Sequence, residues 1–249
     1  MKKRKTLGIL GGLGPMSSVY FYEMLTSHTK AKKDQDHLNI LLSSRADTPD
    51  RTDFITGRST ENPLPSMNRE VSRLAAVGAE LVAIPCNTAH YFYDGIREAS
   101  PIPILNIIRE TADFCSFLGL SKVGVLATDG TVRSGAYKET LEALGIEYMT
   151  CSDEDQKVVT DIIYGSVKQG KEPDIDEFLR VADQLTSEGC QRIILGCTEL
   201  SLLKKNCRLG IRFIDSLEVL ALRAICECGA VPIGFDSELM KFSIGKDVK

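Results

Sequence analysis

The chain has 249 residues and a formal net charge of -4, from 30 basic and 34 acidic side chains. This balance predicts no basic surface for nucleic acid or an anionic membrane, and no apolar stretch is long enough to span a bilayer. Eight cysteines are scattered through a chain long enough to bury a large core, which favours reduced thiols in the cytoplasm over a disulfide framework. No metal site is expected, because the sequence has no Cys-x-x-Cys pair.

Strands and helices are predicted to alternate along the first hundred residues. Glycines at 11, 12 and 14 make a tight turn before a helix that begins at Pro15. The polar segment 44–65 reads as a long functional loop. The other predicted elements are strands at 6–10, 38–43 and 81–85, and a helix from Ser66 to Gly78.

A strand at 104–107 and a helix at 110–118 follow, and the same alternation is then predicted again from Lys122. The apolar spacing predicts strands at 122–127, 146–150 and 192–195, and helices at 134–144, 155–168 and 174–188.

Two cysteines follow strands in matching positions of these two passes. Gly8 to Cys86 spans 78 positions, and Gly124 to Cys197 spans 73. We therefore predict an α/β protein of two similar, doubly wound domains with mainly parallel sheets, related by a pseudo-twofold axis. Because ligands bind at the carboxyl ends of parallel strands, the active site is expected in the cleft between the domains.

Two opposed thiols suit the inversion of an α-carbon. A thiolate on one face removes a proton and a thiol on the other face returns one, which is general acid–base catalysis. Free N–H groups at the helix starts that follow Cys86 and Cys197 favour the thiolate form. Backbone amides and the side chains of Asn87, Thr88 and Thr198 can stabilise the charge that develops on the substrate carboxylate. A lone buried cysteine is more often a core residue, so the matching pair carries this interpretation.

Five motifs together resemble the aspartate/glutamate racemase family, and more narrowly its cofactor-independent aspartate racemase branch. They are GILGGLGP at 8–15, PDRT at 49–52, PCNTAH at 85–90, LATDGT at 126–131 and GCTEL at 196–200. The resemblance implies that Cys86 and Cys197 are the catalytic acid/base pair, and that neither pyridoxal phosphate nor a metal is used. It also implies a small acidic amino acid as substrate, with aspartate first and glutamate second, and a homodimer.

The resemblance further assigns substrate-binding residues and domain limits. It implies that Arg51 and Lys168 bind substrate carboxylates, and that Asn87, Thr88 and Thr198 line the site. Each half would pass its final strand to the other, so that residues 1–102 plus 212–249 form the first domain and 103–211 the second.

Several alternatives stay open at this stage. Arg45 competes with Arg51 as the main carboxylate contact, and Glu199 either positions the substrate ammonium, tunes Cys197 or only begins a helix. His90 is as well explained by a helix-end or core hydrogen bond as by a base. A maleate isomerase or hydantoin racemase of the same superfamily, or a non-catalytic amino-acid-binding protein, would share many of these features.

Overall fold

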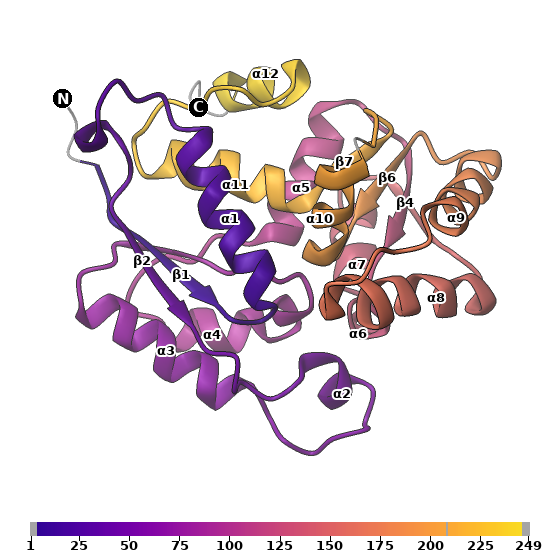
Figure 1. Ribbon diagram of the computed structural model, residues 1–249, viewed down its shortest axis with the longest axis horizontal. Helices are drawn as coiled ribbons and strands as arrows, with labels where there is room; N and C mark the ends of the chain where they lie inside the picture. The colour runs from indigo at the N-terminus through magenta and orange to yellow at the C-terminus, as the bar shows by residue number, and fades with distance from the viewer. Residues whose placement is uncertain (1–3, 208, 246–249) are drawn as a thin grey trace.

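Two parallel sheets organise the computed structural model, which describes residues 4–207 and 209–245 (Figure 1). The first has the order β2-β1-β3 and the second the order β5-β4-β6-β7, with every strand pair parallel. The strands are β1 (Leu7–Gly11), β2 (Ile40–Ser44), β3 (Leu81–Ala83), β4 (Lys122–Leu126), β5 (Glu147–Thr150), β6 (Arg192–Leu195) and β7 (Phe213–Asp215). The predicted α/β class with two parallel sheets is confirmed.

The helices of the first half pack around β1, all five residues of which are buried. Helix α1 (Pro15–Ser27) begins at the predicted proline, α3 (Leu64–Ala76) precedes β3, and α4 (Tyr93–Ala99) follows a single 3₁₀ turn at Thr88–Phe92. The segment 44–65 is not entirely loop, because it contains α2 (Arg51–Ile55). The Asp50 side chain caps this helix by accepting from the Asp53 N–H.

Three predictions about the second half were wrong in detail. The strand expected at 104–107 is a single bridge between Ile104 and Val82, because Asn106 already caps α5 (Ile107–Phe117). The helix expected at 134–144 is two helices, α6 (Asp129–Ser134) and α7 (Ala136–Glu142), separated by Gly135 at φ +70°.

The helix expected at 155–168 changes its winding part of the way along. Helix α8 (Asp153–Thr160) continues as a π-helical segment, Asp161–Ser166, and then as a 3₁₀ turn, Val167–Gln169. The remaining helices of this half are α9 (Ile175–Ser187) and α10 (Thr198–Cys207). The π-helical segment reaches the first half of the molecule, where its Tyr164 hydroxyl bonds to Thr52 of α2.

The final strands are not exchanged between the halves. Ile104 pairs with β3 of the first sheet, and β7 pairs with β6 of the second. Each follows a helical crossover from the strand that it pairs with, and consecutive parallel strands are most often neighbours in the sheet. Residues 213–215 therefore lie in the second sheet, and the rest of the expected division at 103 and 212 stays a prediction.

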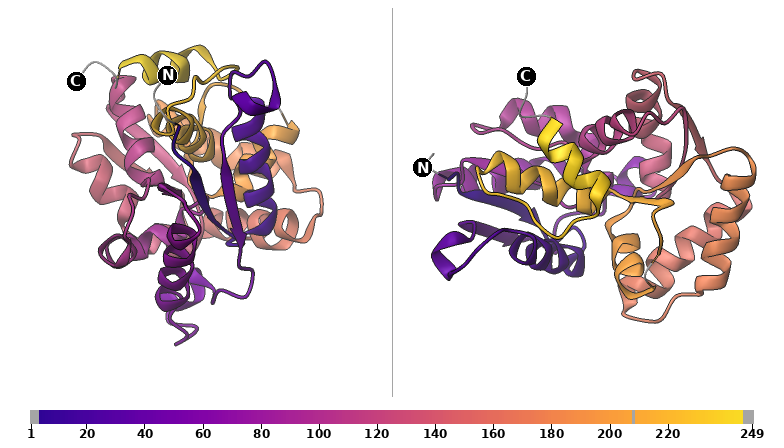
Figure 2. Two further views of the ribbon diagram at one scale, coloured as in Figure 1. Left: turned by 90° about the vertical axis from the view of Figure 1, so that its left-hand side faces the viewer. Right: turned by 90° about the horizontal axis from the view of Figure 1, so that it is seen from above.

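The chain closes with two helices that lie across both halves. Helix α11 (Ser216–Glu227) packs against α1 and α5, and α12 (Ser237–Gly245) packs against α11 and α5. Figure 2 shows the two halves side by side with these yellow helices over them. The largest apolar core accordingly contains residues of β1, β4, α5 and α11 together. No helix in the described ranges has the length and apolarity needed to cross a membrane.

Candidate active site

One small cavity is lined by both strand-end thiols. Cys86 and Cys197 are 6% and 5% exposed, and they come from different halves of the molecule. The other lining residues are Leu13, Asp50, Arg51, Thr52, Asn87, Thr88, Thr128, Tyr164, Lys168, Thr198 and Glu199. The structure thus brings together all eight residues that the sequence proposed for the site.

The position of Cys86 is fixed by the imidazole of His90. Burial lowers the pKa of His90, so the ring is neutral. Its Nε2 accepts the Ile107 N–H at 3.2 Å, and therefore Nδ1 carries the proton and donates to the Cys86 carbonyl at 2.9 Å. Of the two readings of His90, this geometry gives it a structural role.

Cys197 lies directly before α10 and donates a hydrogen bond to a carboxylate. Its Sγ is 2.9 Å from Oε2 of Glu199. Burial, together with the negative charge of Glu199, raises the pKa of Cys197 well above its ordinary value. Cys197 is therefore a neutral thiol at neutral pH, ready to give a proton.

Lys168 and Glu199 form a charged pair over the thiols. Lys168 Nζ lies 4.0 Å from Glu199 Oε1 and 4.1 Å from the centre of the Tyr164 ring. Burial lowers the pKa of Lys168, but the negative charge of Glu199 beside it outweighs this effect, and the pKa is raised. The ammonium is thus within electrostatic reach of both sulfurs and stays charged.

The glycine turn of the first half closes the site beside this pair. A Cβ at Gly14 would overlap the Glu199 carboxylate, so a larger residue there would displace Glu199 from its present position.

Arg51 is a buried cation without a carboxylate partner in the described part of the chain. Its guanidinium donates to the carbonyls of Leu13, Thr48 and Pro49 at 3.0 to 3.3 Å, and its Nε has no partner among these residues. Arg45 instead pairs with Asp47 on the surface at 2.8 Å and does not line the cavity. Of the two arginines, Arg51 is therefore the one that lines the cavity.

The predicted polar contacts are largely engaged within the protein. Asn87 donates to Ser216 Oγ at 3.0 Å and accepts from the Tyr137 hydroxyl at 2.8 Å. Both ends of its amide are therefore engaged, and these hydrogen bonds hold Asn87, the residue after Cys86, in place. Thr88 bonds to the hydroxyls of Thr128 and Thr131, and Thr198 donates to the Pro85 carbonyl.

Sequence reasoning missed Tyr164 and Thr52 as parts of the site. The Tyr164 hydroxyl donates to Thr52 Oγ1 at 3.0 Å, which joins the π-helical segment of the second half to α2 of the first. Thr52 lies within the PDRT motif, and Asp50 is a capping residue that could have indicated α2, whereas no sequence pattern predicts the π-helical turn that carries Tyr164.

The cavity is closed around the thiols. The space that the centre of a water molecule can occupy is about 10 Å³, which is enough for one water. A wider cavity of about 410 Å³ adjoins it, and the two share Asp50, Arg51, Lys168 and Glu199. A substrate that enters from the wider cavity must therefore pass between these charged residues.

Comparison with known proteins agrees with this geometry. Residues 10–224 match the family model described as Asp/Glu/Hydantoin racemase. The chain belongs to this racemase family. The family that the five motifs resembled is thereby confirmed.

Individual relatives of this racemase cover most of its length. The chain is 28% identical to the broad specificity amino-acid racemase RacX of Bacillus subtilis over 224 residues, which are 86% of this chain and 94% of that protein. It is 26% identical to a glutamate racemase of Limosilactobacillus reuteri over 63% of this chain and 59% of that one. The solved aspartate racemase of Picrophilus torridus is 30% identical, with a TM-score of 0.81 over 92% of this chain and 96% of that one.

Proposed function

We propose that this racemase interconverts L- and D-aspartate without a cofactor, with Cys86 and Cys197 as the acid/base pair. The observation that carries the proposal is the single closed cavity lined by two buried thiols from opposite halves. Aspartate ranks before glutamate because the solved aspartate racemase of Picrophilus torridus reaches a TM-score of 0.81 with this chain, whereas the glutamate racemase of Francisella tularensis reaches 0.59.

In one direction the Cys86 thiolate removes the α-proton of bound aspartate. The electron pair left on the α-carbon is delocalised into the α-carboxylate, and the Cys197 thiol gives its proton to the opposite face. Cys86 then holds the proton and Cys197 is the thiolate, which is the state needed for the other enantiomer. Each proton transfer contributes on the order of 10²–10⁴-fold to the rate.

Charged residues supply the recognition of an acidic substrate. Arg51 would form a charge-assisted hydrogen bond with one carboxylate through its free Nε, and Lys168 would bind the other. Glu199 would attract the substrate ammonium through Oε1. The Cys197 thiol uses only Oε2, and Lys168 is 4.0 Å from Oε1. The backbone N–H groups at the start of α10 favour the negative charge that develops on the α-carboxylate.

The test is chirally resolved turnover of L- and D-aspartate by the purified protein without added cofactor. The Cys86→Ser and Cys197→Ser variants should each lose racemisation by at least about 10²-fold, because a serine hydroxyl is a much weaker acid than a thiol and is not ionised to act as the base. In each variant, exchange of the α-proton with deuterated water should survive for one enantiomer only. Cys207→Ser is the matched control, since Cys207 is exposed and outside the cavity.

Full racemase activity in either thiol variant would refute the two-base assignment. Turnover of glutamate, maleate or a hydantoin in preference to aspartate would favour one of the other members of the superfamily. Binding of aspartate without any deuterium incorporation would identify a non-catalytic binding protein. The homodimer and the cytoplasmic location remain predictions.

A further inference from the structure

A second pocket lies away from the thiols, at the start of α11. It has a volume of about 280 Å³ and shares no lining residue with the thiol cavity or the wider cavity beside it. Its walls come from the ends of α1 and α10, from β7, α11 and α12, and from Phe114 of α5. This volume is just below the usual range of small-molecule sites, roughly 300–1,000 Å³.

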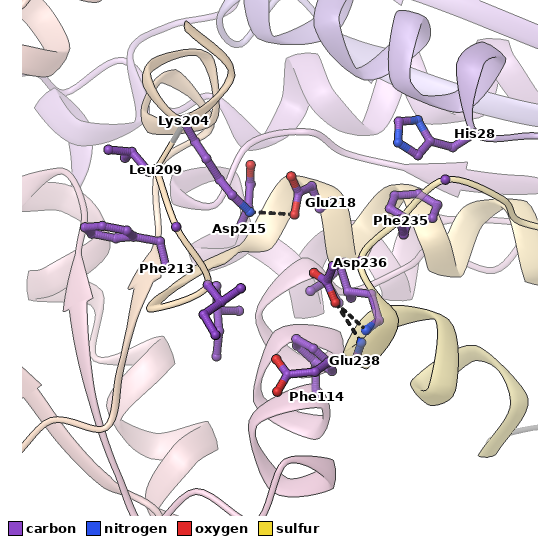
Figure 3. A pocket seen from close by; sticks show the side chains of 16 residues that line it. His28, Phe114, Lys204, Leu209, Phe213, Asp215, Glu218, Phe235, Asp236 and Glu238 are labelled. Carbon is purple, nitrogen blue, oxygen red and sulfur yellow. Dashed lines mark hydrogen bonds and ion pairs between the residues drawn. The ribbon is translucent and has the colours of Figure 1, made fainter. Parts of the chain in front are cut away.

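The charged residues of this pocket are mostly acidic (Figure 3). Among the described residues that line it, one is a lysine, Lys204, and none is an arginine. Four are acidic, namely Asp215, Glu218, Asp236 and Glu238. Lys204 is already committed, because its Nζ pairs with Glu218 Oε2 at 2.7 Å. Burial lowers the pKa of His28, so this ring adds no positive charge at neutral pH.

Asp215 lines this pocket and has one oxygen without a hydrogen-bond donor among the described residues. The residue is 2% exposed, and its Oδ1 accepts from Ser201 Oγ at 2.6 Å and from the Leu217 N–H at 2.9 Å. Its Oδ2 is buried and finds no donor among the described residues. A buried carboxylate oxygen without a donor costs free energy, which a bound cation would recover.

The rest of the wall is apolar and aromatic. Phe114, Phe213 and Phe235 line the pocket, together with Leu209, Ile211 and Leu239. Aromatic faces attract cations, and the aliphatic side chains favour a hydrocarbon body. A bare metal ion fits this wall poorly, and the described residues contain no group of three or more acidic, histidine or cysteine side chains arranged to hold one.

We propose that the pocket formed by Asp215, Glu218 and the surrounding phenylalanines binds a primary ammonium ion that carries a short aromatic or aliphatic body. The ammonium donates to Asp215 Oδ2 and lies beside Glu218, and the body contacts the aromatic wall. The site is independent of the proposed racemase chemistry.

Loss of a proton from Glu218 is a second measurable effect of binding. Burial and the neighbouring charge of Asp215 raise the pKa of Glu218 to about 7. A bound ammonium favours the ionised carboxylate, so that binding near neutral pH releases a proton. The groups that face Glu218 are Asp215 before the same helix, Lys204 of α10, Tyr20 of α1 and Asp236 before α12.

The experiment is calorimetric titration of the full chain with benzylamine, with benzyl alcohol and benzoate as neutral and anionic probes of the same shape. Benzylamine should bind one site per chain, and the other two probes at least about tenfold more weakly. Saturating aspartate should not displace benzylamine, because the two cavities are separate. Titration in two buffers of different ionisation enthalpy should detect the released proton.

Three variants test which residues hold the ammonium. Asp215→Asn and Glu218→Gln should each weaken benzylamine binding by about tenfold or more, whereas Lys204→Met should strengthen it, because Lys204 competes for the same carboxylates. Glu238→Gln is the control, with an effect below about threefold, since Glu238 already pairs with Arg192 at 3.6 Å. Asp215→Asn keeps the oxygen that Ser201 and the Leu217 N–H use, and circular dichroism checks the fold of each variant.

Benzyl alcohol binding as tightly as benzylamine would overturn the proposal. So would unchanged benzylamine affinity in both folded carboxylate variants, or the absence of any binding at millimolar benzylamine. If Asp215→Asn does not fold, the opposite effects expected for Glu218→Gln and Lys204→Met still decide the question.

Discussion

The two thiols of this racemase have different neighbours. Cys197 donates to Glu199, whereas the carbonyl of Cys86 is held by a neutral His90. Burial and then the negative charge of Glu199 raise the pKa of Cys197, so this thiol stays protonated at neutral pH. The pair is thus chemically unequal, although its positions in the two halves correspond.

Glu199→Gln should change the pH dependence of only one direction of the reaction. The charge and hydrogen bond of Glu199 raise the pKa of Cys197, so their removal lets the thiolate form at lower pH. The ascending limb of kcat/KM should move to lower pH for the enantiomer whose proton Cys197 removes. Profiles for L- and D-aspartate between about pH 6 and 10 measure this. Two unshifted profiles would contradict the tuning role.

Tyr137→Phe should lower the free energy of unfolding by about 1–2 kcal/mol. The Tyr137 hydroxyl is buried and donates to Asn87 Oδ1 at 2.8 Å, and its loss leaves that oxygen without this donor. Urea unfolding of the variant measures the change. Tyr91→Phe is the control, because the Tyr91 side chain is 49% exposed and should change stability by less than about 0.5 kcal/mol. Equal stabilities for the two variants would refute the contribution.

At the scale of elements, α2 and the π-helical segment decide how the cavity is closed. Both are short and lie in stretches that the sequence predicted as a loop or as regular helix. They meet through the Tyr164–Thr52 hydrogen bond, and the 3₁₀ turn that follows places Lys168 beside Glu199. We call the Tyr164–Thr52 hydrogen bond and the Lys168–Glu199 pair the closing contacts.

Tyr164→Phe should raise KM for aspartate by about three- to tenfold, with a smaller change in kcat. The variant keeps the ring under Lys168 but loses the hydrogen bond to Thr52, and so it weakens the closed state without touching the thiols. Steady-state kinetics with Tyr91→Phe as control measure the effect. An unchanged KM would mean that this hydrogen bond does not hold the cavity closed around substrate.

At the scale of the whole molecule, two sheets and one shared apolar core surround a cavity with room for about one water. The closing contacts must therefore part before an amino acid can reach the thiols. Because α5 and α11 pack between the halves and contribute to the same core, we expect opening to be limited to the polar side that carries α2 and the π-helical segment.

Alkylation of the cysteines should report this opening. Iodoacetamide should modify the exposed Cys207 first, and Cys86 and Cys197 much more slowly, since both are buried. Tyr164→Phe should speed the modification of the two cavity thiols and leave Cys207 unchanged. Peptide mass spectrometry resolves the sites, with the fully buried Cys115 as the slow reference. Modification of Cys86 as fast as Cys207 would contradict a closed cavity.

The sequence by itself determined the alternation of strands and helices, the two parallel sheets and the strand-end positions of Cys86 and Cys197. These depend on apolar spacing and on glycine, proline and capping residues, which act over a few neighbouring positions. The family resemblance added Arg51 and Lys168, which local patterns alone leave as ordinary charges.

Only the tertiary structure decided which strand pairs with which, how the π-helical turn brings Tyr164 to Thr52, and that Asn87 is held by Tyr137 and Ser216. It also separated Arg51 from Arg45 and revealed the unused oxygen of Asp215. These features depend on contacts between residues far apart in the chain, in some cases by more than a hundred positions. Such contacts exist only once the packed core has fixed the distances between the halves.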